Sequence, residues 1–242
     1  MIIWLASYPR SGNTLFRILL HRLFGFQTYS VYSAASAAER MPDDNDRMMR
    51  LVGQSELETD VGLLHSSSGV HFVKTHDLPG DDGSPAVVLV RDGRAAVVSY
   101  AYFLLKTERG IEEPERDLFE TTLEQVIMGD AYGGWSRNVK AWIDRVGQPN
   151  IVRYEDLIAD PVNIAAAALR RLGFREEAKD TVPPSFQELH ASIRWFFRRG
   201  KPESWRDDMP SHLEELFVER HGETLVQLGY SLRTSSSVPG VK

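Results

Sequence analysis

The sequence predicts a single α/β domain with a central parallel β-sheet flanked by helices. The chain has 242 residues, 42% of them hydrophobic, which is enough for one sizeable core and makes one domain the default. Four short apolar segments have the pattern of buried strands, and they alternate with segments of helical periodicity. This alternation is typical of parallel sheets whose two faces are covered by helices.

The elements follow in chain order from local patterns. The apolar run 2–7 predicts a strand that enters a loop at Tyr8-Pro9, and 11–24 has a helical apolar face that stops at Gly25. The polar stretch 30–65 predicts loops and short helices. Strands are expected at 70–75, 86–90 and 151–154, and helices at 93–105, 118–128, 135–146 and 161–172. The domain is expected to span 1–233, followed by a disordered Ser-, Gly- and Pro-rich tail, 234–242.

Composition narrows the class of protein. The chain has no cysteine, which excludes disulfides, cysteine zinc sites and thiolate nucleophiles. The net charge of −6 argues against a nucleic-acid partner, although one local basic pocket for a small anion is compatible with it. Without a signal-peptide pattern or a long apolar run, we expect a cytoplasmic protein without a membrane span.

Polar residues follow all four predicted strands. Ligands of parallel sheets bind outside the carboxyl ends of the strands. Here those ends lead into 8–14, Thr75-His76, 91–93 and 154–156, and all four carry polar side chains. The sequence therefore predicts one site built from these four segments.

The first of these segments has the chemistry of an anion-binding loop. Free N–H groups and the helix dipole at a helix N-terminus favour an anion, and a glycine allows close approach of the backbone. Arg10 can add a charged fork, and Ser11 and Thr14 can add hydroxyls. The alternative is a helix capped by Ser11 with Arg10 in solvent. The loop lacks the G-x-x-x-x-G-K-[ST] pattern of P-loop NTPases.

A second anion site is predicted after the strand 86–90. Arg91 stands at the end of that strand and Ser99 lies on the next helix. An arginine and a hydroxyl in these positions can hold a phosphate. The alternative is an ordinary surface ion pair between Arg91 and Asp92 or another carboxylate.

Taken together, these segments resemble the cytosolic-type sulfotransferases that use PAPS (3′-phosphoadenosine 5′-phosphosulfate). Residues 7–14 resemble the loop Y-P-K-S-G-T-T-W, and Arg91 and Ser99 resemble an R-x7-S pair. The other segments that resemble family motifs are Lys74-Thr75-His76, Tyr154-Glu155-Asp156-Leu157 with Asp160-Pro161, Ser185-Phe186, and Arg198-Arg199-Gly200 with Trp205. These motifs occur in the family's order between residues 7 and 205, so the resemblance implies the P-loop NTPase-like sulfotransferase fold.

The resemblance also implies roles for these residues. His76 is the expected general base, Lys74 the expected contact of the transferring group, and Arg10 the expected stabiliser of the bridging oxygen. PAPS, and its product PAP, would be held by Arg10, Ser11, Gly12, Asn13, Thr14, Arg91, Ser99, Tyr154, Ser185, Phe186, Arg198, Arg199 and Gly200. No metal is expected. The partner is expected to be a small molecule or natural product with a hydroxyl group.

Two departures from the family pattern keep other functions open. Arg10 stands where the family usually has lysine, and Leu15 stands where a tryptophan commonly stacks on adenine. They allow the alternative of a catalytically silent protein that binds 3′-phosphonucleotides. A P-loop kinase is a further alternative, opposed by the missing Walker lysine. The acceptor pocket is expected to come from the irregular stretches 30–65 and 107–117, and the sequence leaves the identity of the acceptor and the oligomeric state open.

Overall fold

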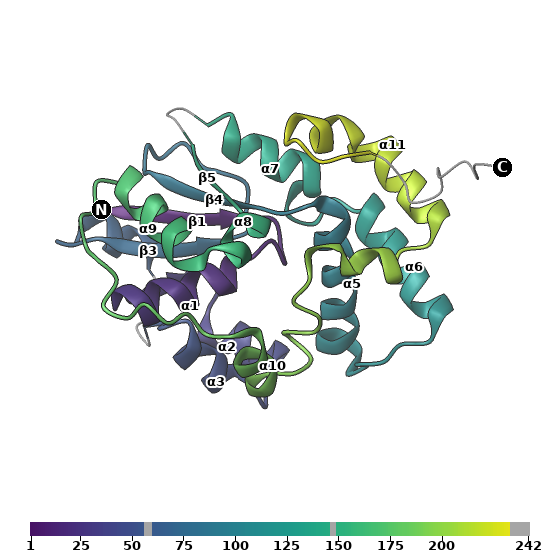
Figure 1. Ribbon diagram of the computed structural model, residues 1–242, viewed down its shortest axis with the longest axis horizontal. Helices are drawn as coiled ribbons and strands as arrows, with labels where there is room; N and C mark the ends of the chain where they lie inside the picture. Colours follow the sequence, from purple (N-terminus) through teal and green to yellow (C-terminus); the bar gives the residue numbers. More distant parts are fainter. Residues whose placement is uncertain (56–59, 146–148, 233–242) are drawn as a thin grey trace.

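Five parallel strands form the centre of the structure, a computed structural model that describes residues 1–55, 60–145 and 149–232. Their order in the sheet is β2-β3-β1-β4-β5 (Figure 1). The strands are β1 (Ile2–Ser7), β2 (Thr28–Ser30), β3 (His71–Thr75), β4 (Ala86–Val90) and β5 (Asn150–Arg153). β2 was not predicted. It is three residues long and pairs with the middle of β3, from Thr28 opposite Phe72 to Ser30 opposite Lys74.

Helices connect and cover the strands on both faces of the sheet (Figure 1). The α-helices are α1 (Asn13–Phe24), α2 (Ala34–Arg40), α3 (Asn45–Leu51), α4 (Val61–Ser66), α5 (Gly93–Arg109), α6 (Arg116–Met128), α7 (Trp135–Ile143), α8 (Tyr154–Ala159), α9 (Pro161–Arg171), α10 (Phe186–Ser192) and α11 (Ser211–Gln227), with 3-10 turns η1 (Ala131–Gly133) and η2 (Pro202–Asp207). The short helices expected within 30–65 are α2 to α4. α8, α10 and α11 were not predicted; α8 begins at Tyr154, which was expected to be the last residue of a strand. The predicted tail 234–242 lies outside the described residues.

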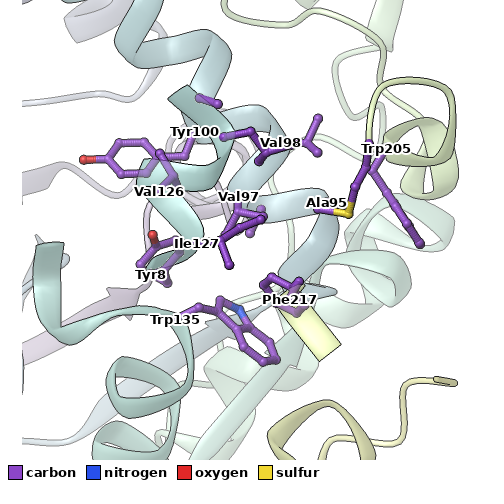
Figure 2. Packing of buried hydrophobic residues seen from close by; sticks show 14 of the residues in the cluster. Tyr8, Ala95, Val97, Val98, Tyr100, Val126, Ile127, Trp135, Trp205 and Phe217 are labelled. Atoms are coloured by element: carbon purple, nitrogen blue, oxygen red, sulfur yellow. The ribbon is translucent and has the colours of Figure 1, made fainter. Parts of the chain in front are cut away.

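The side-chain alternation of the strands divides the core into two layers. Ile3, Leu5 and Phe72 pack with α1, α8 and α9 on one face. Ala6, Val88 and Val90 point to the other face, where they meet side chains of α5, α6, α7 and α11. Figure 2 shows part of this second layer, with Tyr8, Trp135, Trp205 and Phe217 among its aromatic members.

Because the strands are parallel, their carboxyl ends lie at the same edge of the sheet. β1 is parallel to β3 and β4, and β4 is parallel to β5. The segments that follow β1, β3, β4 and β5 therefore converge, as the sequence predicts. No helix in the described part of the chain is long and apolar enough to cross a bilayer.

Candidate functional site

One cavity of about 420 Å³ lies at the carboxyl ends of the strands. This volume is in the range of roughly 300–1,000 Å³ that is usual for small-molecule sites. Most residues with a predicted role line it, namely Arg10, Gly12, Asn13, Thr14, Lys74, His76, Arg91, Ser99, Tyr154, Phe186, Arg198, Arg199 and Gly200. Ser11 and Ser185 do not line it. The structure thus gathers side chains that are up to 190 residues apart in the chain.

The loop between β1 and α1 leaves the first turn of α1 open to a ligand. Gly12 precedes the helix with φ of 101°, and no side chain caps the helix there. A side chain at Gly12 would meet the Tyr154 ring, because its Cβ would lie 2.8 Å from Cδ2. Arg10 also has a positive φ, 66°, which is uncommon for a residue other than glycine. The ring of Tyr154 and the bend of the loop therefore require glycine at position 12.

Two polar side chains of this loop are buried and are not available to a phosphate as hydrogen-bond donors. The Nδ2 of Asn13 donates to the carbonyl oxygen of Leu5 at 2.7 Å, and it also lies 3.3 Å from the hydroxyl of Ser7. Its amide thus ties α1 to β1. The hydroxyl of Ser11 is fully buried and has no partner among the described residues. What this loop offers a phosphate is therefore mainly backbone N–H groups and the Thr14 hydroxyl.

Arg10 connects the two predicted anion sites. Its Nε donates to the hydroxyl of Ser99 at 3.1 Å, and its backbone oxygen accepts from Nη1 of Arg91 at 3.0 Å. Its guanidinium lies 3.9 Å above the Phe196 ring and donates to the Phe196 carbonyl. Burial, and then the neighbouring charge of Arg91, lowers the pKa of Arg10 to about 9, so it is charged at neutral pH.

Arg91 does not form the surface ion pair considered as its alternative. Its guanidinium stacks at 4.3 Å on the ring of Tyr154, and no described carboxylate pairs with it. Asp92 instead caps α5 and pairs with Arg94 at 2.8 Å. Arg91 therefore lies free to bind an anion at the end of β4.

The late arginines are held by two aspartates. Arg198 donates to Asp208 at 2.8 Å and stacks on Tyr102, and Arg199 contacts both Asp207 and Asp208. Asp208 is 7% exposed, so it is well placed to hold both guanidinium groups. A phosphate at this position would compete with Asp208 for them.

Phe186 and Gly200 form one contact on the cavity wall. A Cβ on Gly200 would lie 2.2 Å from Cδ2 of Phe186, and Gly200 has φ of 63°. Phe186 is 40% exposed, which leaves ring surface available to a base. Ser185 has a structural role, because its hydroxyl caps α10 in a capping box with Glu188.

His76 has the protonation state that a general base needs. Its Nδ1 lies 2.8 Å from the carbonyl oxygen of Ser7. A carbonyl can only accept, so Nδ1 carries the hydrogen and Nε2 has a free lone pair. Burial, and then the charge of Lys74, lowers the pKa of His76 well below its usual value of 6.5. The backbone is fixed as well, because the N–H donates to the Tyr32 hydroxyl and the carbonyl accepts from Asn138.

The cavity is strongly cationic although the protein is acidic. The charged side chains lining it are Arg10, Arg17, Arg40, Lys74, Arg91, Arg198 and Arg199, and no aspartate or glutamate of the described residues lines it. Burial, followed by the charges of Arg17, Arg10 and Arg40, lowers the pKa of Lys74 to about 7. Its ammonium lies 5.3 Å from the centre of the Tyr32 ring. A polyanion would relieve this concentration of positive charge.

Several lining residues were missed by sequence reasoning. Tyr32 and Tyr132 both pack on the His76 ring, and Arg17 and Arg40 add positive charge. Arg17 carried a signal, since it is the one charge in the apolar run 15–20. Tyr32 and Arg40 lie in the stretch 30–65, which was expected to contribute to the acceptor pocket without individual residues being named; no residue of the other expected stretch, 107–117, lines the cavity.

Aromatic side chains form part of the cavity wall. The apolar run 195–197 would be expected in the core, but its rings are only partly buried, and Phe196 and Phe197 line the cavity. On α5, Tyr100 and Phe103 also line the cavity. Tyr102 packs on Phe119 with ring centres 4.4 Å apart. The described residues contain no cluster of His, Asp or Glu that could hold a metal ion.

Comparisons with known proteins relate the chain to one family. A family model described as "Sulfotransferase domain" matches residues 2–229. Sulfotransferase 1E1 of Mus musculus is 23% identical over 254 residues, which cover 91% of this chain and 82% of the mouse protein. Flavonol 3-sulfotransferase of Flaveria bidentis is also 23% identical, over 92% of this chain and 82% of its own.

A solved structure has the same fold. The mouse sulfotransferase SULT7A1 complexed with PAP aligns with a TM-score of 0.61, at 17% identity, over 93% of this chain and 87% of the mouse chain.

Proposed function

Because the chain belongs to the sulfotransferase domain family and is a PAPS-dependent sulfotransferase, we propose that its cavity binds PAPS and that His76 deprotonates the hydroxyl of a small acceptor. The observation that carries the donor assignment is the cavity of seven cations without a lining carboxylate in the described residues. The site suits an anionic nucleotide, and its 420 Å³ suits a small molecule.

The two ends of the cavity can hold two anionic groups of the donor. The open first turn of α1, with Gly12 and Thr14, suits the 5′-phosphosulfate. Arg91, Ser99 and the arginines of the late loop suit the 3′-phosphate. Phe186, partly exposed, suits a face of the adenine. Because Arg10 contacts Ser99, its guanidinium can bind the 3′-phosphate as well as the transferring sulfuryl group.

His76 would act through Nε2. The acceptor oxygen forms its bond to sulfur while the bond from sulfur to the 5′-phosphate oxygen breaks. The acceptor proton goes to Nε2, and PAP leaves with the electron pair of the broken bond. Lys74 and Arg10 would stabilise the charge that develops on the leaving phosphate. A positioned general base typically contributes roughly 10²–10⁴-fold to the rate.

Transfer of labelled sulfate from PAPS to a panel of alcohols and phenols tests this proposal. His76→Ala should keep its affinity for PAP and lose transfer by roughly 10²-fold or more. The matched control is His212→Ala, which removes an exposed histidine of α11 and should leave both unchanged. Equal turnover in wild type and His76→Ala would remove His76 from the mechanism.

Nucleotide binding tests the donor site separately. PAP should bind more tightly than adenosine 5′-phosphate, and it should need no magnesium. Arg91→Ala and Ser99→Ala should reduce this preference. Preferential binding of ATP with magnesium would favour a kinase. Binding of PAP without transfer to any acceptor would favour a silent nucleotide-binding protein.

A further inference from the structure

Arg17 is a buried cation that has no counter-ion among the residues the structure describes. It is on α1, it is 4% exposed, and it lines the cavity. Neither of its recorded hydrogen-bond acceptors is charged: Nε donates to the Thr28 hydroxyl at 2.9 Å, and Nη2 donates to the side-chain oxygen of Gln54 at 2.9 Å. No described residue accepts from Nη1, and no described carboxylate pairs with the group.

The two acceptors hold the guanidinium in one place. Thr28 forms a parallel bridge with Gln54, and its hydroxyl also donates to the carbonyl oxygen of Val52 at 2.7 Å. The acceptors of Arg17 are thus fixed by backbone pairing at the edge of the sheet. These contacts fix the position of the guanidinium and of its unpaired Nη1, as in a preorganised ligand site.

Another arginine of the chain shows how a buried guanidinium is normally neutralised. Arg94 is 2% exposed and contacts Asp92 at 2.8 Å and Glu214 at 3.2 Å. Arg17 is similarly buried, but no described carboxylate contacts it. Burying an unpaired ion is costly, so this arrangement favours a ligand that supplies the missing negative charge. Burial indeed lowers the pKa of Arg17 to about 9.

The position of Arg17 indicates which ligand would supply it. Arg91 and Ser99, which are proposed to hold the 3′-phosphate, follow β4, whereas the Arg17 guanidinium bonds to Thr28 of β2, at the edge of the sheet on the other side of β1. Ser30 and Lys74 are register partners on β2 and β3, and His76 follows β3. His76 and Arg17 line the same cavity, so an acceptor that presents its hydroxyl to His76 can reach Arg17 over β2 and β3.

We propose that Arg17 is an anion-binding subsite for the acceptor, and that the acceptor carries a carboxylate, sulfate or phosphate in addition to its hydroxyl. This inference rests on the proposed function, because it names the substrate class of the same cavity. Met41, Met48 and Met49 line the cavity too, so the body of the acceptor is apolar. Arg17 binds and positions this molecule, and His76 remains the base.

Binding to the PAP-saturated protein tests the subsite without turnover. Benzoate is the anionic probe and benzamide its neutral counterpart, and both are titrated by calorimetry. Wild type should prefer benzoate. Arg17→Gln should weaken benzoate binding by about 10- to 100-fold, as expected for the loss of a hydrogen bond to a charged group, and should weaken PAP binding much less. Arg17→Lys should keep the preference. The matched control is Arg22→Gln, which removes an exposed arginine from the same helix.

Kinetics provide the second readout. A hydroxylated acid and its methyl ester, for example 4-hydroxyphenylacetate and its ester, are compared as acceptors. Wild type should have the lower KM for the acid, and Arg17→Gln should abolish this difference in KM between the acid and its ester. Equal binding of benzoate and benzamide to the PAP-saturated wild type would overturn the inference even if the glutamine variant fails to fold. Failure of PAP itself to bind would instead refute the proposed function.

Discussion

Lys74 should make the pH profile of the enzyme depend on whether the donor is bound. In the nucleotide-free protein its pKa is about 7, because it is buried beside Arg17, Arg10 and Arg40. A bound donor brings negative charge to the same cavity. One charge about 4 Å away contributes about 4 kcal/mol at an effective dielectric constant of about 20. Since one pKa unit is about 1.4 kcal/mol, the pKa of Lys74 should rise by about 3 units in the complex.

The pH profiles of kcat/KM and kcat distinguish the nucleotide-free enzyme from its complex with the donor. kcat/KM for PAPS reports the free enzyme, and it should fall about tenfold per pH unit above 7 as Lys74 loses its proton. kcat at saturating PAPS should stay level to about pH 9. The acid limb belongs to His76 and should lie below pH 6.5, since its lowered pKa keeps the base neutral until more acidic conditions. Initial rates with an alcohol acceptor, which does not titrate in this range, measure both profiles.

Lys74→Arg isolates the cause of the basic limb. A guanidinium stays protonated, so the decline of kcat/KM above pH 7 should disappear in this variant. The matched control is Lys140→Arg, which changes an exposed lysine of α7 and should retain the limb. A level kcat/KM up to pH 9 in wild type, or a limb that survives in Lys74→Arg, would refute the reasoning.

Three further predictions concern stability and the cavity wall. The unfolded chain keeps a proton on Lys74 up to pH 10.5, whereas the folded chain releases this proton near pH 7. The free energy of unfolding should therefore rise between pH 7 and 9.5 by up to about 1.4 kcal/mol per pH unit. Urea titrations should show that Lys74→Met loses this pH dependence. Gly93→Ala would place Cβ 2.5 Å from a buried aromatic ring and should cost at least about 1–3 kcal/mol, whereas Gly83→Ala, with nothing within 4 Å, should be nearly neutral in the same assay. Gly200→Ala would collide with Phe186 at 2.2 Å, so calorimetry should show weaker PAP binding; an unchanged Kd would exclude Phe186 from the nucleotide site.

The strands that the sequence predicts well are those with the simplest environment. β1 and β4 have the predicted bounds, because each is a continuous apolar run that is buried on both faces. β2 escaped prediction because its three residues are polar, and its burial comes from pairing with β3 and Gln54. α11 is similar: its buried residues include Glu214 and His221, so polar side chains interrupt its apolar stripe.

The loops of the site were predictable for a related reason. Each follows a strand, and parallel strands bring their carboxyl ends together, so Gly12, His76 and Arg91 were expected to converge. The directions of the side chains were not predictable. Asn13 is in the predicted loop, but its amide bonds to β1. Ser185 is in a predicted motif, but its hydroxyl caps a helix. Such choices depend on the acceptors that the fold places nearby.

By itself the sequence determined that an anion site would form where strands enter loops, because apolar runs, glycines and arginines at strand ends are local features. Only the tertiary structure decided which arginines keep their charge available. Arg94 is neutralised by Glu214, which is 120 residues away in the chain, while Arg17 meets only neutral acceptors. The attraction between charges depends on their distance in space and on their burial, and spacing along the chain reports neither.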